Sequence, residues 1–128
     1  MMVQKSLYFG DLETARKIIE TQNPSDQKEL GRSVKNFFPD EWSKVSERFV
    51  YFANKEKFKE KLYRKYLLET GDSLIAEASL ADTIWGIGLS EDDPRALDPA
   101  QWRGENRLGK ILMRVRQEIQ DEISRIVE

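Results

Sequence analysis

Residues 104–127 read GENRLGKILMRVRQEIQDEISRIV and contain the strongest periodic signal in this chain. Apolar residues recur there at the three- and four-residue spacing that places side chains on one face of an α-helix. Asn106 is suited to cap such a helix, and Gly109 allows close packing near its start. The stretch predicts a long helix with one apolar face, formed by Leu108, Ile111, Leu112, Val115, Ile119, Ile123 and Ile126.

Shorter segments with the same helical spacing precede this stretch, separated by Gly, Asn and Pro residues. Residues 73–78 and 83–89 are short and apolar between turn residues, so each is predicted to be a small strand. The predicted fold class is mostly α (an α-rich α+β fold): a single compact helical domain over residues 1–128, with about five to six helices and one small β element. The earlier helices are expected at residues 12–20, 24–30, 39–52 and 58–67.

The composition excludes several classes of protein. Charged residues make up 34% of the 128 residues and the mean hydropathy is -0.66, which excludes a membrane protein. Lys and Arg number 21 against 23 Asp and Glu, and the net charge of -2 argues against a general nucleic-acid coat. The first residues do not have the pattern of a secretory signal, so a cytoplasmic location is expected.

The chain contains neither cysteine nor histidine. It therefore has no thiolate nucleophile, no Ser-His triad, no imidazole base and no metal site built on Cys or His. Catalysis would have to use carboxylates, lysine, tyrosine or a bound cofactor. We predict that neither a metal nor a cofactor is needed.

The segment Gly104–Gly109 is a candidate anion site. Exposed N–H groups at a helix start, beside the cation of Arg107, would favour a phosphate. A turn followed by an Asn106 cap explains the same residues without any ligand, because Asn caps are common.

The segment Asp82–Gly88 is a candidate site for a flat ring. Gly86 would let a ligand approach the backbone, and the indole of Trp85 could stack on the ligand. A core tryptophan in a strand with a glycine bulge is at least as consistent with the pattern.

Three further positions carry the same ambiguity. Trp42 lies on the apolar face of a predicted helix and would ordinarily belong to the core. Gly31-Arg32 could hold an anion or end a helix. Lys5 is most simply a solvated lysine, although a partly buried lysine could act as a nucleophile.

Eight segments follow one another in a specific order: Gln4-Lys5, Leu30-Gly31-Arg32, Trp42, Lys57-Phe58, Leu67 to Gly71, Leu74 to Glu77, Trp85 to Gly88, and Gly104 to Met113. Each is weak alone, but the ordered set resembles the NADAR family, also called YbiA-like, over essentially the whole chain. The resemblance implies an N-glycosidase. Family members hydrolyse the bond between a nitrogen and a ribose carbon, in early riboflavin-pathway intermediates or in ADP-ribosylated guanine.

Such a reaction develops positive charge on the sugar, so a carboxylate, a positioned water and an anion-binding clamp would assist it. A lysine could instead attack the anomeric carbon and pass through a Schiff base. Neither route needs histidine, cysteine or a metal.

The resemblance assigns roles position by position. Lys5 matches a lysine that follows Gln, as a nucleophile or a phosphate contact, and the tryptophans match rings around the substrate. Asn106 and Arg107 match a segment near phosphate or ribose, while Asp82 is inferred as a carboxylate from its neighbourhood. The predicted site therefore contains Lys5 and Asp82 for catalysis, and Gly31, Arg32, Trp42, Trp85, Gly86, Asn106 and Arg107 for substrate binding.

Two departures from the family pattern affect the expected activity. The riboflavin-type branch has an acid directly after Trp-Gly, where this chain has Ile87. Residues 90–100 form an Asp- and Pro-rich insert. Both features favour the ADP-ribose-type branch. Met1 follows the point where the family's N-terminal segment, with its Asn-Phe motif and catalytic Glu, would occur. The alternatives are a non-catalytic or truncated ADP-ribose-binding module and a helical interaction domain with purely structural aromatics.

The expected partner is a small nucleotide or ADP-ribosyl substrate. ADP-ribosylated nucleic acid is a second partner class that the resemblance implies, and no membrane partner is expected. The sequence does not indicate an oligomeric state.

Overall fold

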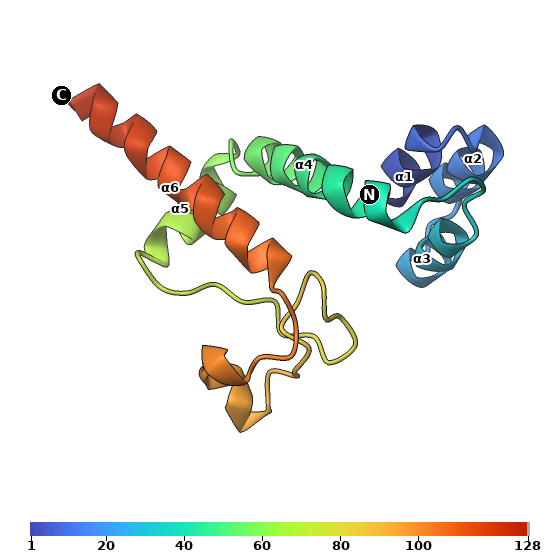
Figure 1. Ribbon diagram of the computed structural model, residues 1–128. Helices are drawn as coiled ribbons and strands as arrows, with labels where there is room; N and C mark the ends of the chain where they lie inside the picture. Colours follow the sequence, from blue (N-terminus) through green and yellow to red (C-terminus); the bar gives the residue numbers. More distant parts are fainter. Residues whose placement is uncertain (128) are drawn as a thin grey trace. The chain divides into compact units, whose positions relative to one another are not determined.

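Across residues 1–127, which the structure describes, the computed structural model contains six α-helices and two short 3-10 helices (Figure 1). The chain divides into two compact units, Met1–Val50 and the residues from Tyr51 onward, and the division falls within α4. The single domain expected over residues 1–128 stays a prediction. The elements are α1 (Met2–Tyr8), α2 (Leu12–Glu20), α3 (Pro24–Arg32), α4 (Pro39–Lys57), α5 (Lys61–Glu69), η1 (Pro94–Leu97), η2 (Pro99–Gln101) and α6 (Arg107–Val127).

The first unit is organised by side chains that cap its helices. The Asp11 carboxylate accepts hydrogen bonds from Thr14 N at 3.1 Å and Thr14 Oγ1 at 2.6 Å, and so caps α2. Lys35 N also donates to Asp11 Oδ2 at 2.9 Å, which ties the segment after α3 to the start of α2. Asn23 caps α3 and Pro24 occupies its first turn. The buried apolar side chains are Ala15, Ile18, Val34 and Trp42.

The long helix predicted near the end of the sequence is confirmed as α6, in the second unit. Its apolar face is buried at Ile111, Val115 and Ile119, whereas Ile123 and Ile126 are 44% and 83% exposed. The apolar stripe is therefore covered along the first part of the helix and open to solvent beyond it. No helix within residues 1–127 combines the length and apolar character needed to cross a bilayer.

A buried arginine fixes the segment that follows α5. Arg116 of α6 is 6% exposed, and its Nη1 donates at 2.8 Å both to Thr70 Oγ1 and to Ser73 O. Because both acceptors lie beyond the end of α5, this guanidinium joins the turn after α5 to α6.

The prediction of a small β element is wrong, since the structure has no strand within residues 1–127. The backbone of residues 73–78 bonds instead to the side chain of Asn106, which donates from Nδ2 to Ile75 O at 2.9 Å and accepts from Glu77 N at Oδ1 at 3.0 Å. One amide supplies both a donor and an acceptor, so this segment needs no partner strand. Residues 83–89 form turns whose carbonyl groups face the start of α6.

Candidate functional site

The predicted site residues fall into one group in each unit. Each group is built by contacts within its own unit. Lys5, Gly31, Arg32 and Trp42 belong to the first unit, and Asp82, Trp85, Gly86, Asn106 and Arg107 belong to the second.

Lys5 and Gly31, two of the predicted site residues, are in direct contact. The lysine is 8% exposed, and its Nζ donates to Gly31 O at 2.6 Å. The same Nζ lies 4.0 Å from the centre of the Phe37 ring, a cation-π contact. Burial first, and then the positive charge of Arg32, lower the pKa of Lys5. A lysine with a lowered pKa has more of the neutral amine that a nucleophile needs.

Gly31 and Arg32 form the last turn of α3. Gly31 packs against the Met2 side chain of α1, where a Cβ would collide with the thioether. Arg32 is exposed, and its positive charge interacts favourably with the negative C-terminal end of the α3 dipole. The local geometry thus explains both residues by helix packing, and it leaves the Arg32 guanidinium accessible to an anion.

Trp42 lies in an aromatic cluster and is 9% exposed. Its ring centre is 5.8 Å from that of Phe49, 6.2 Å from that of Phe9 and 6.4 Å from that of Tyr8. The Tyr8 hydroxyl donates to the Glu41 carboxylate, which raises the pKa of Tyr8. These contacts are those of a core aromatic residue, so a substrate ring would meet the cluster through its more exposed members.

The start of α6 is held against residues 82–89 by backbone hydrogen bonds. The three bonds are Asn106 N to Gly86 O (3.0 Å), Arg107 N to Ile84 O (3.1 Å) and Leu108 N to Trp85 O (3.1 Å). Of the two interpretations of this segment, the one with N–H groups open to a phosphate does not hold, because carbonyl groups accept from the N–H groups of residues 106–108. Any anion contact from this region must come from side chains.

Asn106 acts as a clasp and not as a side-chain cap of α6. The residue is 2% exposed, has a positive φ of 54°, and bonds through its amide to Ile75 and Glu77. Gly109 permits this arrangement, because a Cβ there would lie 2.6 Å from Asn106 Oδ1 and closer still to Ile75 O. The Asn-x-x-Gly spacing is the sequence signal that could have indicated the clasp.

Asp82 is positioned by the loop that it stabilises. Its Oδ1 accepts from Ile84 N at 3.0 Å and from Trp85 N at 2.8 Å, the pattern of an Asx turn. Within residues 1–127, no hydrogen bond engages its Oδ2, so this half-buried carboxylate keeps one oxygen for a water or a substrate. Gly86 is required at the centre of the loop, because a Cβ would lie 2.8 Å from Glu77 O.

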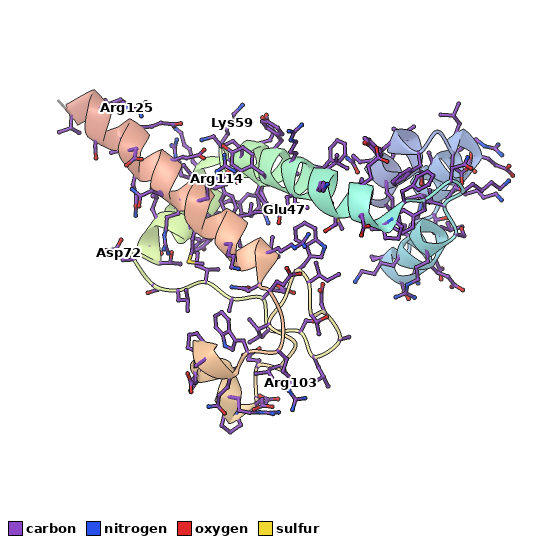
Figure 2. All side chains as sticks on the ribbon, viewed as in Figure 1. Glu47, Lys59, Asp72, Arg103, Arg114 and Arg125 are labelled. Atoms are coloured by element: carbon purple, nitrogen blue, oxygen red, sulfur yellow. The ribbon has the colours of Figure 1, made fainter. Side chains whose placement is uncertain are left out.

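Two more arginines near this loop were not predicted. Arg103 is exposed in the segment before α6 (Figure 2), and its Cβ packs beside Gly88, which has a positive φ of 70°. Arg95 pairs with Asp93 at 2.6 Å, and its hydrogen bonds lower the pKa of Asp93 to about 2. Arg107 is half-buried and forms an ion pair with Glu105 at 3.3 Å. Exposed arginines lack a periodic signal, so sequence pattern alone does not separate them from solvated charges.

Residues 1–120 match the family described as the NADAR domain. The chain belongs to the NADAR family. An N-glycosidase of Acanthamoeba polyphaga mimivirus is 43% identical over 121 residues, covering 94% of this chain and 71% of the viral protein. Protein irg-1 of Caenorhabditis elegans is 40% identical over 122 residues, covering 92% of this chain and 57% of the worm protein.

A riboflavin biosynthesis protein of Vibrio vulnificus is similar at a lower level. It is 28% identical over 114 residues, which cover 88% of this chain and 28% of the bacterial protein. This NADAR chain therefore spans little more than a quarter of the Vibrio relative and over half of the worm relative. The family resemblance drawn from the ordered segments is confirmed.

Proposed function

We propose that this NADAR chain is an N-glycosidase that hydrolyses the N-ribosyl bond of an ADP-ribosyl or phosphoribosyl nucleotide, with ADP-ribosylated guanine as the favoured substrate type. The observation that carries the proposal is the 43% identity, over 94% of this chain, to a viral protein named N-glycosidase. The choice of substrate type rests on Ile87. This residue takes the place of the acid expected after Trp-Gly in the riboflavin-type branch, and it is 1% exposed.

In the lysine route, Lys5 is the nucleophile. Its neutral amine attacks the anomeric carbon, the C–N bond to the base breaks, and the base leaves with a proton. The sugar ring then opens to a Schiff base, which water hydrolyses to release the free sugar and regenerate the amine. The lowered pKa of Lys5 supports this route because it increases the neutral fraction at a given pH.

In the carboxylate route, Asp82 is the base. Water attacks the anomeric carbon as the C–N bond breaks, Asp82 Oδ2 accepts the proton of the water, and the leaving base takes up a proton. The Asx turn supports this route because it holds the Asp82 carboxylate in place through Oδ1 and leaves Oδ2 available to accept the proton. The two routes differ in whether a covalent adduct forms.

A non-catalytic ADP-ribose-binding module is the second candidate. It is favoured by the exposed Arg103, a cation that packs beside Gly88 and forms no ion pair in the described part of the chain. On this reading, Arg107 and the exposed Arg103 would hold the anionic part of the nucleotide. ADP-ribosylated nucleic acid is the macromolecular form in which either candidate would meet the modified base.

The test incubates the chain with ADP-ribosylated guanosine and, separately, with a phosphoribosylated amine, and measures the free guanosine or the free amine by liquid chromatography. We expect release from the ADP-ribosyl compound. Release from the phosphoribosyl compound alone would refute the substrate type, and release from neither would refute the glycosidase.

Borohydride added during turnover distinguishes the two routes. Reduction traps a Schiff base as a stable adduct, visible as a mass increase on the peptide that contains Lys5. A trapped adduct supports the lysine route, whereas turnover without an adduct supports the Asp82 route. The Asp82→Asn variant should then lose activity in the second case and keep it in the first.

A further inference from the structure

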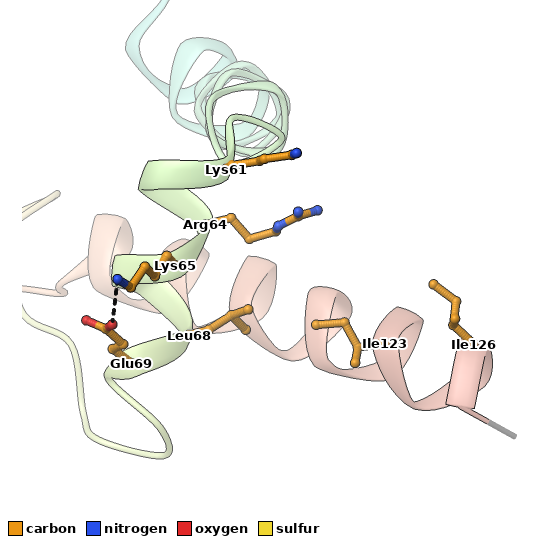
Figure 3. A pocket seen from close by; sticks show the side chains of 7 residues that line it. All are labelled: Lys61, Arg64, Lys65, Leu68, Glu69, Ile123 and Ile126. Carbon is orange, nitrogen blue, oxygen red and sulfur yellow. Dashed lines mark ion pairs between the residues drawn. The ribbon is translucent and has the colours of Figure 1, made fainter.

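A groove of about 670 Å³ lies between α5 and the C-terminal part of α6, within the second unit (Figure 3). Its floor is aliphatic and consists of Leu68 of α5 with Ile123 and Ile126 of α6. Ile126 is 83% exposed and continues the same stripe that buries Ile119 about two turns earlier. Covering this part of the stripe would remove further apolar surface from water. We refer to this feature as the α5–α6 groove.

The α5 wall of the groove is positively charged. Lys61 and Arg64 project to the same side (Figure 3), and neither forms an ion pair within residues 1–127. Lys65 has an acidic neighbour, Glu69, at 3.9 Å, but both side chains are more than half exposed. Residues 57–65 contain five cations and one acid, although the whole chain has a net charge of -2. Three of these cations, Lys61, Arg64 and Lys65, line the groove, against one acid, Glu69.

We propose that the α5–α6 groove docks an acidic amphipathic helix of a protein partner. The apolar face of such a helix would cover Leu68, Ile123 and Ile126, as helices do when they bind in hydrophobic grooves. Its carboxylates would lie against Lys61 and Arg64, whose charges form no ion pair within residues 1–127.

Nucleic acid fits this groove less well than an acidic helix. Among the described residues, no aromatic side chain lines it, and single-stranded nucleic acids bind by stacking their bases on aromatic rings. A sugar-phosphate backbone would make no apolar contact with the aliphatic floor. Under an amphipathic helix, both the floor and the charged wall find complementary groups.

The test uses a fluorescein-labelled peptide of about five helical turns, with Leu at i, i+3, i+4 and i+7 and Glu elsewhere. A second peptide keeps the Leu pattern and replaces Glu by Lys, and the third probe is labelled oligothymidylate. Anisotropy at near-physiological salt measures binding to the full chain. Amide shifts locate the site. We expect the Glu peptide alone to bind, with shifts confined to residues 61–69 and 119–127.

Three variants complete the test. The double variant Lys61→Glu with Arg64→Glu should weaken Glu-peptide binding about tenfold or more. Ile126→Asp should weaken it as well without harming the fold, because this side chain is largely exposed. Arg125→Glu is the matched control, an exposed cation of α6 that does not line the groove (Figure 2), and it should change binding less than about twofold.

Four results would overturn the proposal. They are failure of the Glu peptide to bind, equal binding of the Lys peptide, tighter binding of oligothymidylate at the same residues, and an equal effect of Arg125→Glu and of the double variant. Shifts at residues 61–69 that depend only on protein concentration would likewise overturn it, because a second copy would then fill the groove.

Discussion

Replacing Asn106 by alanine should destabilise the second unit by about 3 kcal/mol. The substitution removes two hydrogen bonds, to Ile75 O and from Glu77 N, and each contributes about 1 kcal/mol to the free energy of unfolding. It also places alanine at a positive φ of 54°, which costs about 1 kcal/mol more because Cβ approaches the following carbonyl. The sum is large because the side chain is 2% exposed and has no route to water.

Two other variants separate these contributions. Asn106→Gly removes the same hydrogen bonds but tolerates the positive φ, so it should cost about 2 kcal/mol. Asn36→Ala is the matched control for the backbone effect. Asn36 has a positive φ of 59° and is exposed, so this variant should lose only about 1 kcal/mol.

Urea denaturation followed by circular dichroism measures the free energy of unfolding of all three variants. Amide exchange at Glu77 provides a local readout, since its N–H is protected by Asn106 Oδ1 in the wild-type chain. The reasoning is refuted if Asn106→Ala costs no more than Asn36→Ala, or if the exchange rate of the Glu77 amide is the same in Asn106→Ala and wild type.

Two further substitutions test local features of the fold. Gly109→Ala should lower the free energy of unfolding by about 1–3 kcal/mol, because the added Cβ would press on the Asn106 amide and on Ile75 O. Alanine normally stabilises a helix relative to glycine, so a gain in the urea midpoint of this variant would contradict the packing. Hydrogen bonds from Lys35 N and Thr14 hold the pKa of the Asp11 carboxyl at about 2, below its unfolded value of about 3.9. The stability that the ionised Asp11 gives the fold is therefore complete above pH 4 and is lost as the pH falls through 2. Asp11→Asn should therefore flatten the loss of melting temperature between about pH 4 and pH 2, and an unchanged acid limb would show that Asp11 is not its source.

Features encoded by neighbouring residues could be predicted from the sequence. Asp11 and Asn23 cap helices within three residues of themselves, so their role follows from residue type and the pattern that follows. The apolar stripe of α6 is likewise a local periodic signal.

Features that join distant segments could not be predicted in the same way. The Asn106 clasp spans 31 residues to Ile75, and it replaces the strand pairing that the apolar pattern of residues 73–78 indicates. In the sequence, the start of α6 could be open to an anion. The carbonyl groups that pair with its N–H groups belong to a loop about twenty residues earlier in the chain, so no local pattern reveals them. Hydrophobic periodicity contains no information about which backbone groups a distant side chain or loop will satisfy.

The candidate site shows the same division. The sequence marked Lys5 as ambiguous, and burial with the Gly31 hydrogen bond is what distinguishes it from a solvated lysine. Trp42 stayed ambiguous for the same reason, and its aromatic neighbours account for it as a core residue. Side-chain chemistry alone left both readings open, whereas the tertiary surroundings separate them.

The most direct test of the proposed activity measures guanosine released from ADP-ribosylated guanosine by the wild-type chain, Lys5→Met and Lys17→Met. Lys17 is exposed and pairs with Glu13 at 3.3 Å, so its variant controls for loss of a lysine charge. Circular dichroism of each variant verifies the fold. With Lys5 as the nucleophile, we predict release by wild type and Lys17→Met and a loss of about tenfold or more in Lys5→Met. Absence of guanosine release by the folded wild-type chain would contradict the N-glycosidase, and equal release by Lys5→Met would contradict the role of Lys5.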